Sequence, residues 1–145
     1  MTARDIEELG LDGIRARVET PVGDTAVTTT LLGRGNLMNV LAAVSVAIEL
    51  DVPLSVAAEE VSKVSAASHR GAVHRLAEGI VQIDDTYNAS PLAVRTALAT
   101  LAGQATTHGR KVAVLGEMLE LGDQSMALHE GIGPTVVETG VELLI

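Results

Sequence analysis

The sequence predicts an α/β fold in two pieces: a β-hairpin with two helices, followed by an incomplete Rossmann-like domain with a mainly parallel sheet. Residues 13–32 alternate with the period of a strand, and apolar residues then follow helical spacing over residues 37–63. From residue 72 onward, short apolar runs alternate with helical segments. That alternation is typical of a parallel sheet with right-handed crossovers.

The first piece contains two predicted strands and two predicted helices. Apolar and charged residues alternate from Ile14 to Glu19, a turn follows at 21–24, and residues 25–32 are rich in Thr and Val. This pattern predicts a β-hairpin. The helical spacing predicts one helix that Asn36 caps and that runs to about Leu50, and another from about Leu54 to Lys63.

A small, polar segment at residues 62–71 separates the two pieces. We expect domains at 1–64 and 72–145, with a hinge at 65–71. The chain ends inside its last predicted strand, and we expect it to be part of a larger protein.

The second piece begins with a predicted strand pair around a short turn. Its first helix has clear start signals, with Ser90 as N-cap and Pro91 at the first helical position. The expected elements are strands at 72–76, 80–84, 111–115 and 141–145, helices at 91–102 and 124–139, and a loop at 103–110.

Composition narrows the classes of function. The 145 residues carry 10 Lys and Arg against 19 Asp and Glu, a net charge of −9, so we expect no nucleic-acid binding. The chain has no Cys, which fits a reducing, cytoplasmic location. No apolar run of about 18 residues or signal region occurs, so we expect no membrane insertion.

The turn after the strand at 80–84 is the first candidate site. It contains two carboxylates, Asp84 and Asp85, followed by Tyr87, which is the only aromatic residue of the chain, and by Asn88. Open α/β sheets place ligands at the carboxyl ends of their strands. The alternative is that these residues only form a turn, for which Asp and Asn are ordinary choices.

Two further segments offer groups for a nucleotide. Asn36 and Asn39 lie three residues apart on one helix face, where two amides can read a purine edge. The alternative for Asn36 is a plain N-cap. In the predicted hinge, Arg70 can clamp a phosphate and His69 can stack on a base; the alternative is that both are solvated.

A third segment follows the strand at 111–115. Its carboxylates Glu117, Glu120 and Asp123 suit a metal or a substrate amine, or simply the acidic first turn of a helix. Only carboxylates lie near His129 in sequence, so we predict no metal site. Ser125 lacks the strand–turn–helix context of a hydrolase nucleophile. The sequence has no Gly-x-x-x-x-Gly-Lys-Ser/Thr phosphate loop and no Gly-x-Gly-x-x-Gly, so the main phosphate cradle for any ATP must lie outside it.

Taken together, three segments in this order resemble the Mur ligase family. Residues 33–43 resemble its Gly-Arg-His-Asn-x-x-Asn-x-x-Ala-Ala segment, and residues 84–91 resemble the Asp-Asp-Ser-Tyr-Asn-Ala-Asn-Pro signature of one branch. Residues 115–122, with His129 downstream, resemble its Leu-Gly-Asp-Met-Leu-Glu-Leu-Gly segment. The chain departs from these patterns at Gly35 and Ser90, and Gly71 follows Arg70 where the family usually has a larger residue.

The resemblance implies ATP-dependent amide bond formation through an acyl phosphate, with ATP and Mg²⁺ bound mainly by groups outside this chain. It implies UDP-N-acetylmuramoyl-tripeptide and D-alanyl-D-alanine as substrates. Residues 1–64 would end a central ATP-binding domain, residues 72–145 would form part of a C-terminal ligase domain, and the chain alone would be inactive. By the same resemblance Arg70 and Asp85 are catalytic, the nucleotide contacts are Asn36, Asn39, His69, Arg70 and Asp85, and the substrate contacts are Tyr87, Asn88, Glu117, Glu120 and His129.

Two alternatives remain open. One is a non-catalytic α/β binding module, which would not need Asn39, Arg70 and Asp85 to face one cleft. The other is a different amide ligase of the same superfamily, such as a folylpolyglutamate synthase, against which the tyrosine-containing signature argues.

Overall fold

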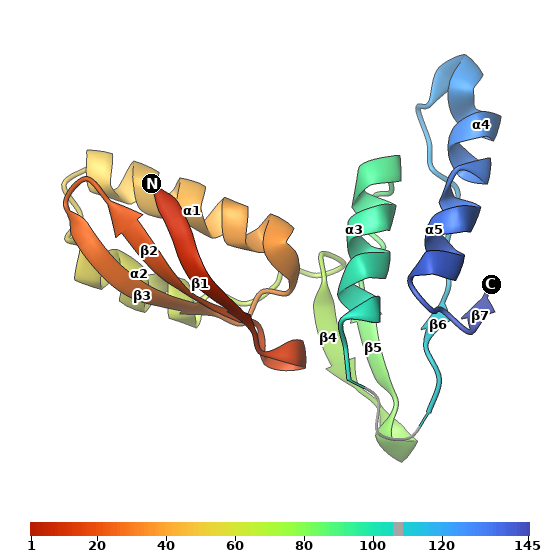
Figure 1. Ribbon diagram of the computed structural model, residues 1–145, viewed down its shortest axis with the longest axis horizontal. Coiled ribbons are helices and arrows are strands. Elements are labelled where there is room, and N and C mark those ends of the chain that lie inside the picture. The colour runs from red at the N-terminus through yellow and green to blue at the C-terminus, as the bar shows by residue number, and fades with distance from the viewer. Residues whose placement is uncertain (106–108) are drawn as a thin grey trace. The chain divides into compact units, whose positions relative to one another are not determined.

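The computed structural model describes residues 1–105 and 109–145, so three residues of the predicted loop at 103–110 lie outside the described residues. The predicted α/β class is confirmed, and the chain divides into two compact units, Met1–Ala66 and Ala67–Ile145 (Figure 1). The boundary falls within the polar segment at 62–71.

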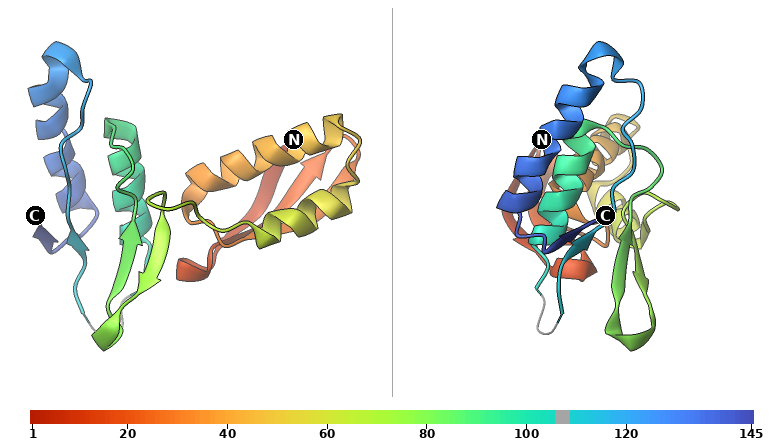
Figure 2. Two further views of the ribbon diagram at one scale, coloured as in Figure 1. Left: turned by 180° about the vertical axis from the view of Figure 1, so that it is seen from behind. Right: turned by 90° about the vertical axis from the view of Figure 1, so that its right-hand side faces the viewer.

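The first unit has a three-stranded antiparallel sheet in the order β1 (Thr2–Glu8), β2 (Ile14–Thr20), β3 (Gly23–Thr29). A short 3-10 helix, η1 (Gly10–Asp12), joins the first two strands. Both helices of the unit, α1 (Gly33–Glu49) and α2 (Leu54–Lys63), cover one face of the sheet (Figure 2).

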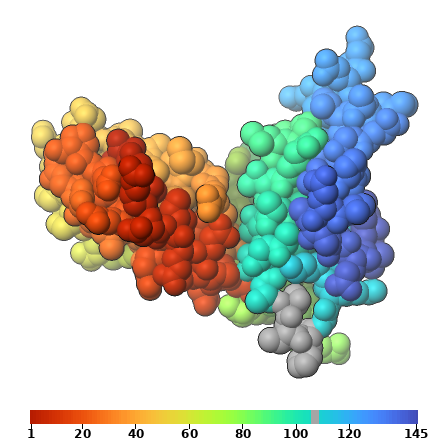
Figure 3. All heavy atoms as spheres, viewed as in Figure 1, coloured from red at the N-terminus to blue at the C-terminus, as the bar shows by residue number. Residues whose placement is uncertain are grey.

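The predicted hairpin and the second helix are confirmed, whereas β1 was not predicted. This strand has an irregularity between Arg4 and Glu7, and Asp5 has a φ of +49°. The bulge breaks the two-residue alternation that identifies a strand. Within β1 only Ala3 and Ile6 are half-buried, and the other residues are exposed. The strand is the edge strand of the sheet, and its atoms, coloured red, are visible in Figure 3.

The core of the first unit joins the sheet to both helices. Its buried members are Val18 and Val27 from the sheet, Val40, Leu41 and Val44 from α1, and Ala57 and Val61 from α2. Ile14, Ala16 and Leu37 form a smaller cluster beside it. Each fully buried aliphatic side chain contributes about 1.5–3 kcal/mol of transfer free energy, which explains why the sheet faces the helices.

The first helix begins four residues earlier than predicted, so the expected N-cap role of Asn36 is wrong. The residue in the N-cap position is Leu32, which forms no side-chain cap. The Asn36 amide instead donates to the Leu32 carbonyl at 2.8 Å from within the first turn. Two glycines in this turn, Gly33 and Gly35, are poor helix formers, so the sequence pattern does not mark these residues as helical.

The second unit begins with an antiparallel hairpin of β4 (Ala72–Arg75) and β5 (Val81–Asp84), joined by the 3-10 helix η2 (Ala77–Gly79). The helix α3 (Pro91–Ala102) follows, and Ser90 caps it by accepting from the Ala93 amide at 3.3 Å, as predicted. The remaining elements are β6 (Val112–Ala113), η3 (Gly122–Gln124), α4 (Ser125–Glu130), α5 (Ile132–Glu138) and β7 (Leu143–Leu144).

Parallel pairing within the described residues is confined to β6 and β7, while β4 and β5 pair separately. The helix expected at 124–139 is divided at Gly131, because Pro134 has no N–H to donate to the carbonyl of Glu130. At this break the Arg95 guanidinium donates to the Gly131 carbonyl at 3.1 Å, so Arg95 has a structural partner. The unit's core consists of Val94, Leu98, Ala113, Met118, Ile132 and Val136.

Candidate functional site

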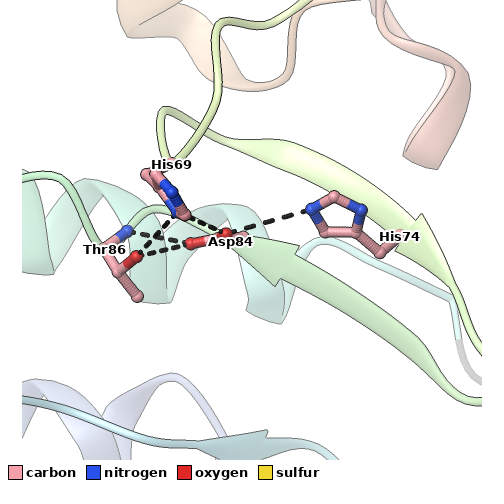
Figure 4. A network of polar contacts seen from close by, with 4 residues as sticks. All are labelled: His69, His74, Asp84 and Thr86. Atoms are coloured by element: carbon pink, nitrogen blue, oxygen red, sulfur yellow. Dashed lines mark hydrogen bonds and ion pairs between the residues drawn. The ribbon is translucent and has the colours of Figure 1, made fainter.

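A polar network surrounds Asp84 at the carboxyl end of β5 (Figure 4). The Asp84 Oδ2 atom accepts from His69 Nδ1 at 2.8 Å. Its Oδ1 atom accepts from the Thr86 hydroxyl at 2.7 Å and from the Thr86 amide at 3.2 Å. The ring of His74 lies farther away, with Nε2 3.9 Å from Oδ2. Both carboxylate oxygens are therefore used, and the network joins three segments of the second unit.

These contacts favour the ionised carboxylate. The Thr86 hydroxyl, followed by the His69 ring and the Thr86 amide, lowers the pKa of Asp84 below its ordinary value of 3.8, while partial desolvation acts in the opposite direction. The Asp84 side chain is only 12% exposed. An acceptor with charge and little water around it forms stronger hydrogen bonds than an exposed one.

The backbone ties the same segments together. The His69 carbonyl accepts from the Tyr87 amide at 3.0 Å, and the Arg70 amide donates to the Ala67 carbonyl at 3.1 Å. His69 has a φ of +62°, in the left-handed region that few non-glycine residues adopt. The segment predicted as a hinge is therefore hydrogen-bonded to the turn after β5.

Arg70 stacks on Tyr87 at this site. The guanidinium carbon lies 3.9 Å from the centroid of the ring, within the range of a cation–π contact. Tyr87 is 64% exposed, and Arg70 forms no ion pair with any residue that the structure describes. A guanidinium that meets a ring through its face keeps its in-plane N–H donors for an anion.

The other two polar residues of this turn have few contacts. Asp85 is exposed and has no hydrogen-bond or ion-pair partner in the described part of the chain. Asn88 is exposed, and its Oδ1 atom accepts from the adjacent Ala89 amide at 2.8 Å. Both side chains are thus accessible from solvent at the start of α3.

His129 holds the segment between β6 and α4. Its Nε2 atom accepts from the Met118 amide at 3.0 Å, and its Nδ1 atom lies 2.8 Å from the Ser125 carbonyl, which assigns the proton to Nδ1. Met118 is 2% exposed and belongs to the core, whereas Glu117 and Glu120 are exposed. Both nitrogens of His129 are occupied, so any ligand contact by this ring requires one bond to break.

The two asparagines of the first unit lie side by side. Asn39 Nδ2 donates to Asn36 Oδ1 at 3.4 Å, so their side chains share one face of the first turns of α1. Asn39 is exposed and Asn36 is half-buried. On the preceding turn Arg34 pairs with Glu8 of β1 at 3.4 Å.

The structure brings His69, Arg70 and Tyr87 together, with Asp84 and Thr86 as partners that the sequence reasoning did not assign. The available signal was the Asp-x-Thr spacing, which is typical of a turn closed by its own side chains. Within residues 1–105 and 109–145, no three His, Cys, Asp or Glu side chains gather as a metal site requires. Among these residues no helix has the length and apolarity needed to cross a membrane.

The chain is similar to ligases of known identity. The UDP-N-acetylmuramoyl-tripeptide–D-alanyl-D-alanine ligase of Buchnera aphidicola subsp. Baizongia pistaciae is 33% identical over 129 residues, which cover 89% of this chain and 27% of that protein. MurF from Acinetobacter baumannii matches with a TM-score of 0.89 at 32% identity, over 98% of this chain and 30% of that one. MurF ligase from Thermotoga maritima, solved in complex with ADP, matches with a TM-score of 0.77 over 99% of this chain and 36% of that one; at 24% identity this is a likeness of fold.

The chain thus spans about 27–30% of the length of the first two of these proteins. A family model described as "Mur ligase, glutamate ligase domain" matches residues 69–145, which contain the Asp84 network, the Arg70–Tyr87 stack and the His129 contacts. Because this match covers more than half of the 145 residues, the chain belongs to the Mur ligase family.

Proposed function

We propose that this chain supplies part of an ATP-dependent ligase that joins D-alanyl-D-alanine to UDP-N-acetylmuramoyl-tripeptide in the synthesis of peptidoglycan precursors. Its similarity to the Buchnera ligase and to Acinetobacter MurF supports this activity. In the proposal, residues 1–64 end the ATP-binding central domain, residues 65–71 are the hinge, and residues 72–145 belong to the C-terminal domain. The longer protein carries the reaction, and we expect the isolated chain to be inactive.

The reaction must overcome the low reactivity of a carboxylate toward an amine. Transfer of the γ-phosphoryl group of ATP to the tripeptide carboxylate gives an acyl phosphate and releases ADP. The dipeptide amine then attacks the carbonyl carbon, loses a proton, and the tetrahedral intermediate expels phosphate. Cations that stabilise the transferring phosphoryl group lower the barrier.

Arg70 is the cation that we assign to this task. Its stacking on Tyr87, without a carboxylate partner among the described residues, is the observation that carries the assignment. A guanidinium so placed offers two parallel N–H donors to a phosphate. We assign Asp85 to the ribose or phosphate, His69 to the nucleotide side, and Asn36 with Asn39 to the adenine.

The dipeptide side is assigned to the exposed residues around the ends of β5 and β6. Tyr87, Asn88, Glu117 and Glu120 are accessible to a substrate. His129 contributes by holding the Glu117–Glu120 segment through the Met118 amide.

ATP is the proposed nucleotide, and the ADP complex of the Thermotoga protein is consistent with that assignment. Magnesium would be held mainly by groups outside this chain, since the described residues offer no cluster of acidic ligands. We propose a cytoplasmic enzyme that binds neither nucleic acid nor membrane.

A chimaera tests the proposal: this chain replaces the matching 30% of Acinetobacter MurF, to which it corresponds with a TM-score of 0.89. We expect the chimaera to form the pentapeptide product from the tripeptide, D-alanyl-D-alanine and ATP, with release of phosphate. A folded chimaera that binds nucleotide but forms no product would refute the proposal in favour of a binding module. A chimaera that adds glutamate to a folate instead would favour the folylpolyglutamate synthase alternative.

A further inference from the structure

Asp84 has no assigned role in the proposed reaction, yet it has more side-chain partners than any of the residues assigned to one at this site. We propose that Asp84 is a positioning residue: it holds His69 and Arg70 against the turn at Thr86 and Tyr87, and so fixes the Arg70 guanidinium over the Tyr87 ring. This inference rests on the proposed phosphate contact of Arg70.

The Asp84 side chain cross-links two segments that are far apart in the sequence. Asp84 Oδ2 is bound to His69, which lies 15 residues earlier, and Oδ1 is bound twice to Thr86. The Thr86 Oγ1 atom also lies 3.3 Å from His69 Nδ1, so the three side chains close a ring of contacts. At 12% exposure the carboxylate has little water to replace a lost partner.

The pairing of the hairpin strands places Asp84 next to the His69–Tyr87 contact. Ala72 and Asp84 form its last pair, and the bond from the Tyr87 amide to the His69 carbonyl continues the pairing three residues farther on each strand. Asp84 is therefore the last residue of the regular ladder, next to this outer bond. The left-handed backbone of His69 is intrinsically unfavourable and persists because these contacts outweigh its cost.

The stack of Arg70 on Tyr87 has little other support from side chains. Tyr87 is 64% exposed, and its stack is the only interaction that the structure gives the Arg70 guanidinium within the described residues. An exposed cation–π contact is weak compared with the rotamer entropy of an arginine. The stack therefore forms only if the backbone holds the two residues next to each other. Asp84 provides this by binding the His69 and Thr86 segments together.

Nuclear magnetic resonance of the 145-residue chain tests the positioning directly. The Tyr87 ring should shift the Arg70 Nε–Hε and Hδ resonances, with Tyr87→Leu as the reference without a ring current. We expect Asp84→Asn to remove more than half of that shift while cross-strand contacts between Val73 and Ile83 persist. The matched control is Glu78→Gln in the distal turn of the same hairpin, which should change nothing.

A second variant covers the case in which Asp84→Asn unfolds the hairpin. Thr86→Val removes one donor to Asp84 and keeps the side-chain shape, and it should reduce the Arg70 shift partially. If either variant keeps the hairpin contacts and its Arg70 shift is unchanged, the inference is refuted.

The chimaera separates this inference from the proposed function. Asp84→Asn should raise the KM for ATP by about tenfold, as expected for the loss of charge-assisted hydrogen bonds, and leave the KM for UDP-N-acetylmuramoyl-tripeptide, to which no residue of this turn is assigned, unchanged. Equal effects on both substrates would mean a merely structural role. If the parent chimaera forms no product, the proposed function fails, and the resonance experiment still decides the position of Arg70.

Discussion

Replacing Arg70 by alanine in the chimaera should lower kcat/KM for ATP sharply. The proposed contact joins a guanidinium to a phosphoryl group that carries transition-state charge, and its loss should cost about 2–4 kcal/mol, or roughly 30- to 1,000-fold in rate. The stack on Tyr87 contributes little to this figure. A cation–π pair at an exposed ring is worth about 0.5–1 kcal/mol, so Tyr87→Leu should cost only about two- to fivefold.

Initial rates of phosphate release, measured over a range of ATP concentrations, give these values. Arg70→Lys adds a second test, because a lysine keeps the charge and loses the planar pair of donors. It should recover only a minor part of the lost rate.

The control must be an arginine without a structural partner. Arg95 does not qualify, because it donates to the Gly131 carbonyl between α4 and α5. Arg110 is exposed and has no hydrogen-bond or ion-pair partner in the described ranges, so Arg110→Ala should change turnover by about 0.5 kcal/mol or less. Equal rates for Arg70→Ala and Arg110→Ala would refute the phosphate assignment.

Three further predictions concern stability, measured by urea unfolding. His129→Ala should destabilise the second unit by about 1–3 kcal/mol, because it leaves the amide of the buried Met118 without its acceptor; an unchanged midpoint would contradict this. The contacts that lower the pKa of Asp84 stabilise the folded state at pH values above 3.8, the ordinary pKa of this group. This stabilisation is lost as the pH falls through the lower pKa that Asp84 has in the folded state. Asp84→Asn should therefore reduce the free energy of unfolding at pH 7 and leave it unchanged at strongly acidic pH. Gly13→Ala should lower the free energy of unfolding by more than about 2 kcal/mol, because the new Cβ would clash with the Thr29 carbonyl oxygen and Gly13 has a φ of +106°. Unchanged stability of this variant would show that the backbone relaxes freely.

Elements with local signals could be predicted from the sequence. The start of α3 follows from Ser90 and Pro91, and the bounds of α2 follow from its periodicity alone. The edge strand β1 could not be predicted, because its bulge removes the alternation on which the prediction depends. The division between α4 and α5 has a local cause in Pro134, which the helical spacing of the surrounding residues concealed.

The candidate site shows a similar limit. Composition and turn chemistry drew attention to Tyr87 and Asp85, since these signals lie within a few residues of each other. The bond from His69 to Asp84 joins residues 15 apart, and nothing in either local sequence specifies it. That contact depends on hairpin register and on a left-handed residue outside the strands, both of which are settled by the fold.

The stack of Arg70 on Tyr87 also gives the chain a built-in optical reporter. With one Tyr, no Trp and no Phe, all of its intrinsic ultraviolet emission comes from a single ring, and a cation lies 3.9 Å from the centre of that ring. Any event that draws the guanidinium away changes the surroundings of the only emitter. Movements at this site can therefore be followed in the unlabelled protein by tyrosine fluorescence, with no background from other residues.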